Sequence, residues 1–170
     1  MTDVQTLIDR PVNVVAAVVF VDSIAMVLAR NNLAGKVIND WYNQFTLGAF
    51  VADVGSICFG IFLSLALFKY ILPTGSFTLG TFVISVVLIQ LLHDLLFGQL
   101  IMGYPKHQNR MMDLFKKYVD ENSWKILLVD GAMMALSAVI IYHLAKKNVN
   151  KVIMYAATAF LLYVAQFLIY

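Results

Sequence analysis

The sequence predicts an all-α membrane protein, a five-transmembrane-helix bundle that forms a single domain over residues 1–170. Hydrophobic residues make up 61% of the chain and charged residues 13%, whereas soluble domains average about 45–50% and about 25%. The mean hydropathy is +0.81. The apolar residues also form runs too long for the core of a soluble domain, which excludes a soluble globular enzyme.

A transmembrane helix needs about 20 predominantly apolar residues, and five segments meet this requirement. The first follows Pro11, a residue that suits the first turn of a helix. The third follows the helix-breaking run Pro73-Thr-Gly-Ser76. The predicted spans are residues 12–29, 45–68, 78–102, 125–145 and 152–170. An odd number of spans puts the chain ends on opposite sides of the membrane, which we call side A (N-terminal) and side B.

The connection between the third and fourth spans, residues 103–123, is longer than the others. Its apolar residues recur near helical spacing, and its charged residues fall on other faces: Met111, Met112, Phe115, Tyr118 and Val119 against Lys116, Lys117 and Asp120. This pattern is typical of a short amphipathic helix in the membrane interface. A helix that packs on the bundle in contact with water is an equally good interpretation.

Charge and aromatic residues say little about orientation. The 12 basic residues divide into five on side A and seven on side B, so the positive-inside rule hardly separates the two sides. The net charge is only +2, and without a basic stripe we expect no nucleic-acid partner. Four aromatic residues fall at the side B ends of spans and predict an aromatic belt at the headgroups: Trp41, Tyr42, Tyr104 and Trp124.

Four of the ten acidic residues lie inside predicted spans: Asp22, Asp53, Asp94 and Asp130. An Asp near the centre of a membrane helix costs roughly 2.5–3.5 kcal/mol, so each must face the bundle interior or water. Because neighbouring helices run in opposite directions, each of the four lies off the middle of its span towards side B. We therefore expect the four carboxyl groups to converge at one depth as a polar cluster.

Gln90 and His93 extend this predicted cluster. Gln90 and Asp94 are four residues apart and share a helix face. His93 points about 100° away from Asp94, so an aspartate on another helix is an alternative partner for its ring.

Clustered carboxyls in a low-dielectric interior cannot all be ionised. Three consequences remain open: the carboxyls share protons and hold the helices together, they exchange protons with side B, or they bind a cation such as Mg²⁺, Ca²⁺ or Mn²⁺. No cofactor is predicted apart from such a cation. The sequence has no HExxH, GxSxG or paired-cysteine zinc motif, so we assign no catalytic residue.

Small residues recur at four-residue spacing in two of the spans. They are Ala52, Ser56 and Gly60 in the second span, and Gly131 and Ala135 in the fourth. This spacing lets helix backbones approach closely in membranes, and we interpret it as structural.

Four runs of residues carry a family resemblance. They are Phe50-Val-Ala-Asp53, Gln90-Leu-Leu-His-Asp94-Leu-Leu-Phe97, Asn109-Arg-Met-Met-Asp113-Leu-Phe-Lys-Lys-Tyr118 and Asp130-Gly-Ala-Met-Met134. Over residues 41–170 the chain resembles small multi-pass membrane proteins encoded by giant viruses, the nucleocytoplasmic large DNA viruses. The resemblance implies a viral protein of the virion internal membrane or of a host endomembrane, and it implies no particular activity.

Three hypotheses on function follow. The first, which we favour, is a proton or cation channel or transporter that uses Asp22, Asp53, Gln90, His93, Asp94 and Asp130. The second is a structural or assembly protein of the virion membrane, in contact with capsid or other virion membrane proteins through loops 103–123 and 146–151. The third is a metal-dependent enzyme that acts on lipid. We expect the protein to form homo-oligomers in the lipid bilayer.

Overall fold

The computed structural model describes residues 3–31, 33, 36–73 and 75–169, and their side chains except those of residues 37, 121–123, 125 and 126. These residues form α-helices and no β-strand. The helices are α1 (Val4–Ile8), α2 (Pro11–Arg30), α3 (Lys36–Tyr70), α4 (Leu79–Gly103), α5 (Arg110–Lys146) and α6 (Lys151–Ile169).

Local sequence explains where several helices begin. Pro11 occupies the first turn of α2, where its missing N–H is no loss. Thr78 and Thr81 cap α4 by reciprocal bonds between side chains and backbone, as in a capping box. The side-chain oxygen of Asn109 accepts the first free N–H groups of α5, which would otherwise lack partners.

Five of the described helices are long and apolar enough to cross a membrane. They are Pro11–Arg30, Ile38–Tyr70, Leu79–Gly103, Leu127–Lys146 and Lys151–Ile169. The structure thus confirms five long apolar helices, and their bounds differ from those of the predicted spans by one or two residues except at the start of the second. The protein is therefore an all-helical chain with the composition of an integral membrane protein.

Two segments differ from the prediction. Residues 36–44, which we expected in a short connection, are helical and begin α3. Residues 110–123 are helical as predicted, but they continue into the fourth span as the first part of α5. Hydropathy missed the first of these because the segment is short and mixed in polarity.

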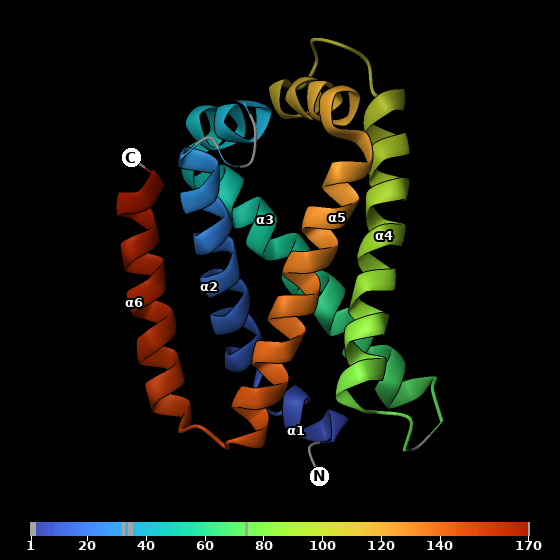
Figure 1. The fold of residues 1–170 in the computed structure, drawn as a ribbon, viewed down its shortest axis with the longest axis vertical. Helices are drawn as coiled ribbons and strands as arrows, with labels where there is room; N and C mark the ends of the chain where they lie inside the picture. The colour runs from blue at the N-terminus through green and yellow to red at the C-terminus, as the bar shows by residue number, and fades with distance from the viewer. Residues whose placement is uncertain (1–2, 32, 34–35, 74, 170) are drawn as a thin grey trace.

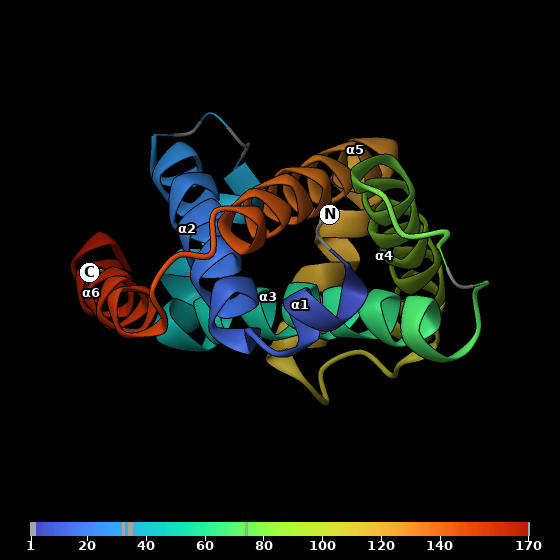
Figure 2. The ribbon, with the colours of Figure 1, turned by 90° about the horizontal axis from the view of Figure 1, so that it is seen from below.

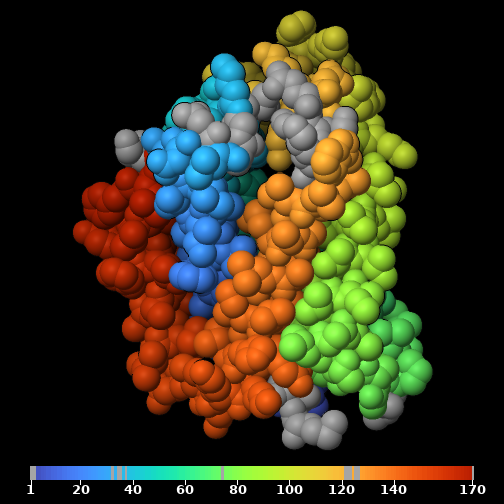
Figure 3. All heavy atoms as spheres, viewed as in Figure 1, coloured from blue at the N-terminus to red at the C-terminus, as the bar shows by residue number. Residues whose placement is uncertain are grey.

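Four helices lie side by side in the order α6, α2, α5, α4, and α3 crosses behind them (Figure 1). The space-filling view shows these four on one face of the molecule (Figure 3). From below, α3 forms the second layer and α1 lies against it (Figure 2). The two chain ends lie at opposite ends of the bundle (Figure 1), as an odd number of spans requires.

A sharp bend at Thr46 divides α3 into two parts. Thr46 has φ 45° and ψ −122°, an outlier for a β-branched residue. Such a conformation costs about 1–3 kcal/mol and persists only where the surroundings hold it. The bend turns residues 36–45 across the side B end of the bundle, while the rest of α3 runs towards side A (Figure 1).

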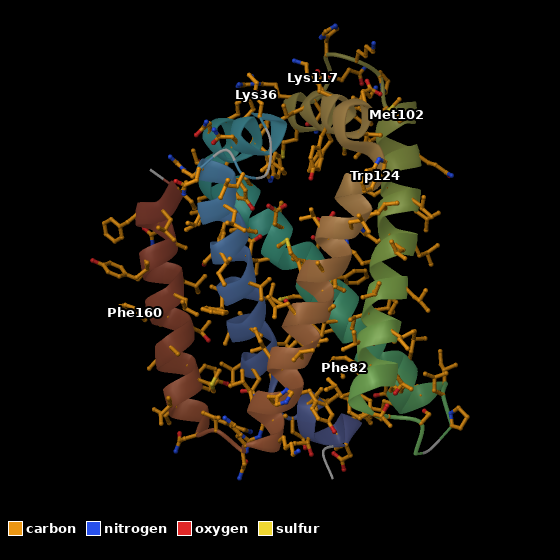
Figure 4. All side chains as sticks on the ribbon, viewed as in Figure 1. Lys36, Phe82, Met102, Lys117, Trp124 and Phe160 are labelled. Atoms are coloured by element: carbon orange, nitrogen blue, oxygen red, sulfur yellow. The ribbon has the colours of Figure 1, made fainter. Side chains whose placement is uncertain are left out.

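An apolar core closes the side A half of the bundle. Helices α2, α3, α4 and α5 contribute to it, and the fully buried side chains include Val18, Ile61, Phe82, Val86, Met134 and Ile141. Phe82 marks its depth near the side A end in Figure 4. The cavities beside the four membrane aspartates therefore lie in the other half of the bundle, towards side B.

Among the glycines that the structure describes, Gly60 has the closest neighbouring side chains. A Cβ at this position would lie 2.9 Å from Met134 Cε and 3.7 Å from Ile89 Cγ2. We expect Gly60→Leu to overpack the core and destabilise the protein by about 1–3 kcal/mol. Titration with a denaturing detergent, followed by circular dichroism, measures this change.

Gly55 on the same helix provides the matched control for this experiment. A Cβ there would meet no atom within 4 Å, so Gly55→Leu should leave stability unchanged or slightly raised. Equal stabilities of the two leucine variants would contradict close packing at Gly60.

Candidate functional site

The four membrane aspartates come from four helices and line two adjoining cavities. The smaller cavity, of about 130 Å³, is lined by Asp22, Asp53 and Asp130. The larger cavity, of about 770 Å³, is lined by Asp53, Asp94 and Asp130. The residues common to both walls are Asp53, Ser56, Gln90, Phe115, Tyr118 and Asp130. The structure therefore brings the carboxyl groups of all four helices to one polar region.

Tyr42 joins the aspartates of α2 and α3. Its hydroxyl donates to Asp53 Oδ2 at 2.9 Å and lies 3.4 Å from Asp22 Oδ1. Trp41 Nε1 donates to the same Asp53 oxygen at 3.0 Å. In a straight helix these donors would lie about 17 Å from Asp53 along the axis. The bend at Thr46 folds residues 36–45 back so that both donors reach the carboxyl.

The hydrogen bonds of Tyr42 indicate which of the two carboxyls, Asp22 or Asp53, can be ionised. A tyrosine hydroxyl has one hydrogen to donate, and the shorter contact assigns it to Asp53. Asp22 is fully buried, and its Oδ2 has no partner among the described residues. A buried carboxylate without compensation costs several kcal/mol. We infer that Asp22 carries a proton, which it can donate to the Tyr42 oxygen.

Asp94 is held by two neighbours on its own helix. Gln90 Nε2 donates to Asp94 Oδ1 at 2.6 Å, and His93 Nδ1 lies 3.0 Å from the same oxygen. The first contact follows from the four-residue spacing. His93 pairs with the adjacent residue rather than with an aspartate of another helix. The second Asp94 oxygen is buried and has no partner among the described residues.

Asp130 and Tyr118 both line the two cavities. Asp130 accepts no hydrogen bond from the part of the chain that the structure describes. Burial, followed by the nearby carboxyls of Asp130, Asp53 and Asp94, raises the pKa of the Tyr118 phenol above its ordinary value. The phenol therefore keeps its proton at physiological pH and can act as a hydrogen-bond donor inside the cavities.

The side B wall of the cavities is aromatic. The Trp41 ring lies 4.7 Å from that of Phe115, and Phe115 lies 5.8 Å from Phe97. His93 stacks on Phe97 at 5.5 Å. Figure 4 shows that α5 changes direction near Trp124. This turn lets Phe115 cover the carboxyls from the first part of α5.

The aromatic-belt prediction is wrong for Trp41 and Tyr42. Each is only 3% exposed, and both donate into the bundle interior. Trp and Tyr combine an apolar body with a polar tip, so the same residues suit a headgroup layer and a buried hydrogen bond. The signal that sequence reasoning missed is that buried acceptors need donors. Trp124 is 63% exposed, in keeping with a belt position.

Both predicted partner loops make hydrogen bonds within the chain. Inside loop 103–123, the Lys116 ammonium group donates to the backbone carbonyl of Tyr104. At the other end, the Arg10 guanidinium donates to the backbone carbonyl of Val149 at 2.7 Å. Contact of these loops with capsid or membrane proteins stays a prediction.

Neither a metal centre nor a relative identifies the site. Within the described ranges, no group of three or more His, Cys, Asp or Glu side chains is arranged to hold a metal ion. Comparison with family models, curated proteins and solved structures found no significant match to this chain. Function has therefore to be argued from the chemistry of the cavities themselves.

Proposed function

We propose that the protein transports protons across a membrane, or small cations in their place, and that the carboxyl cluster is the exchange site. One observation carries this proposal: carboxyl groups from α2, α3, α4 and α5 line two cavities that share a wall. Ionisable residues inside membrane helices are costly, and they commonly mark proton or ion pathways. In this protein four such residues line one site.

The local chemistry favours protons as the transported species. Asp22, Tyr42 and Asp53 form a chain in which neighbouring groups can pass a proton along hydrogen bonds. The carboxyl-lined parts of both cavities have room for water with several polar partners. Water in the shared wall would connect this chain to Asp130 and Asp94, with the Tyr118 hydroxyl as a further donor.

Access from side B runs through the larger cavity in this proposal. Its lining extends from the carboxyls to Met102 and Trp124, near the side B ends of the third and fourth predicted spans (Figure 4). Residues 36–45 and 110–123 would lie in the membrane interface and cover the carboxyls. The predicted amphipathic pattern of residues 110–123 supports this placement.

Access from side A requires a change of conformation. The apolar core around Ile61 and Met134 lies between the carboxyls and that side. Buried polar groups continue along the same helix faces, at Ser64, which bonds Ser85 at 2.9 Å, and at Ser137. Ser64 and Ser137 follow Asp53 and Asp130 by about three and two helical turns. These features favour a carrier that opens alternately over a permanently open pore.

Proton flux into liposomes tests the proposal directly. Purified protein is reconstituted around a pH-sensitive dye, and a pH gradient is imposed with the potential clamped by potassium and valinomycin. We expect protein-containing liposomes to acidify faster than empty ones, and parallel assays with sodium and potassium decide between protons and cations. Absence of all three fluxes from folded protein, over a range of pH and voltage, would favour the structural hypothesis instead.

A further inference from the structure

The larger cavity has an apolar wall that proton exchange does not use. Its volume of about 770 Å³ falls within the range of small-molecule sites, about 300–1,000 Å³. Leu95, Phe97 and Leu127 line it from α4 and α5. Gly98 leaves further space in this wall, because a Cβ there would meet no atom within 4 Å. Such a wall suits a hydrocarbon group better than it suits water.

The same cavity reaches the surface that a lipid bilayer would cover. Leu95 is 57% exposed and Met102 is 51% exposed, and both belong to the lining. Trp124, across from them on α5, is also exposed and lies close to Met102 in Figure 4. A molecule dissolved in the side B leaflet can therefore enter from the side, past the exposed lining residues of α4.

The floor of the larger cavity is rich in carboxyl groups, which accept hydrogen bonds. Asp53, Asp94 and Asp130 line it, and none of its described lining residues is Lys or Arg. Asp94 Oδ2 is buried without a partner among the described residues. Behind the shared wall, the fully buried Asp22 leaves a further oxygen unpartnered. Buried polar atoms are normally hydrogen-bonded, so this floor suits a ligand that donates.

We propose that the larger cavity binds a hydrophobic amine, with its ammonium group between Asp94 and Asp130 and its hydrocarbon group along the apolar wall. An ammonium group has three hydrogens to donate and no acceptor, which complements this floor. Its bonds to carboxylates are roughly twice as strong as bonds between neutral groups. A fatty acid or an anionic phospholipid would instead bring net negative charge against the same carboxylates. The inference does not depend on transport, because binding can be measured without flux.

Photolabelling with three matched probes tests this inference. The probes share one alkyl chain with a diazirine and differ only in the head, which is a primary amine, an alcohol or a carboxylic acid. Each is added to the full chain in phosphatidylcholine nanodiscs at neutral pH, and labelled peptides are located by mass spectrometry. Phe160 of α6 points away from the bundle and is 64% exposed (Figure 4). Labelling around it therefore reports how much probe the bilayer contains.

We expect the ratio of α4 labelling to α6 labelling to be highest for the amine. Asp94→Asn should weaken amine binding by about tenfold or more, the usual effect of losing a charged hydrogen bond, and should leave the alcohol unchanged. Gly98→Phe should fill the cavity and abolish α4 labelling, whereas Gly55→Phe, outside the cavity lining, should not. Two results would overturn the proposal. One is an equal labelling ratio for the three head groups, and the other is an amine ratio that neither Asp94→Asn nor Gly98→Phe changes.

Discussion

Liposomes that contain the Asp53→Asn variant are expected to take up protons no faster than empty liposomes. The amide oxygen can still accept from Trp41 and Tyr42, so the hydrogen bonds that hold the residue in place remain. The amide cannot take up and release a proton, which removes the exchange step at the wall shared by the two cavities. Asp94→Asn should abolish flux for the same reason. Its amide oxygen can still accept from Gln90, so the residue should keep its position. The measurement is the rate of dye quenching under an imposed pH gradient.

Asp120→Asn is the matched control for this loss of flux. Asp120 is exposed on α5 and lines neither cavity, so its replacement removes one carboxyl without touching the cluster. Wild-type flux in this variant, with empty-liposome rates in the other two, would establish the cluster as the pathway. Undiminished flux through folded Asp53→Asn and Asp94→Asn protein would mean that protons cross by another route.

Replacement of Tyr42 by phenylalanine is expected to destabilise the protein by about 3 kcal/mol. Asp53 loses a hydrogen-bond donor, and the buried Asp22 loses the hydroxyl that it contacts. Asp22 would have no hydrogen-bond partner left among the described residues, and Asp53 would keep only Trp41. Equilibrium unfolding in mixed micelles of mild and denaturing detergent measures the change in free energy. Double-mutant cycles with Asp22→Asn and Asp53→Asn then apportion the loss between the two carboxyls.

Tyr163→Phe on α6 is the control for removal of a hydroxyl as such. Tyr163 is exposed on the outer helix, so this variant should unfold at the same detergent fraction as the wild type. If Tyr42→Phe also left the free energy of unfolding unchanged, the hydrogen bonds of Asp22 and Asp53 would have to come from ordered water and not from the phenol.

Much of the architecture could be predicted because its causes are local or general. Runs such as residues 12–29 are long and apolar enough to span a bilayer, and hydropathy alone locates them. The convergence of the four aspartates followed from the cost of an acid that faces lipid, which rules out most helix rotations. The contact of Gln90 with Asp94 followed from helical spacing.

The roles of Trp41, Tyr42, Phe115 and Tyr118 at the site were not predicted, because each depends on a helix that changes direction along its length. Sharp kinks usually arise at proline or at glycine and serine pairs, and Thr46 carries no such signal. Without that bend, Trp41 and Tyr42 have no route to Asp53, and a belt at the headgroups is the natural interpretation. Phe115 and Tyr118 escaped in the same way, because α5 turns near Trp124 before its span begins. The viral source, the oligomeric state and the partner proteins stay predictions.

The bend at Thr46 also couples residues 36–45 to the carboxyl of Asp53 thermodynamically. Because Trp41 and Tyr42 both bond Asp53, residues 36–45 cannot lift from the bundle without breaking those two contacts. Any factor that displaces this segment, and so breaks these contacts, therefore alters the proton affinity of Asp53. By reciprocity, protonation of Asp53 changes the hold on the segment by the same free energy. With residues 36–45 in the membrane interface, as proposed above, lipids that displace this segment would therefore be coupled to the protonation of Asp53.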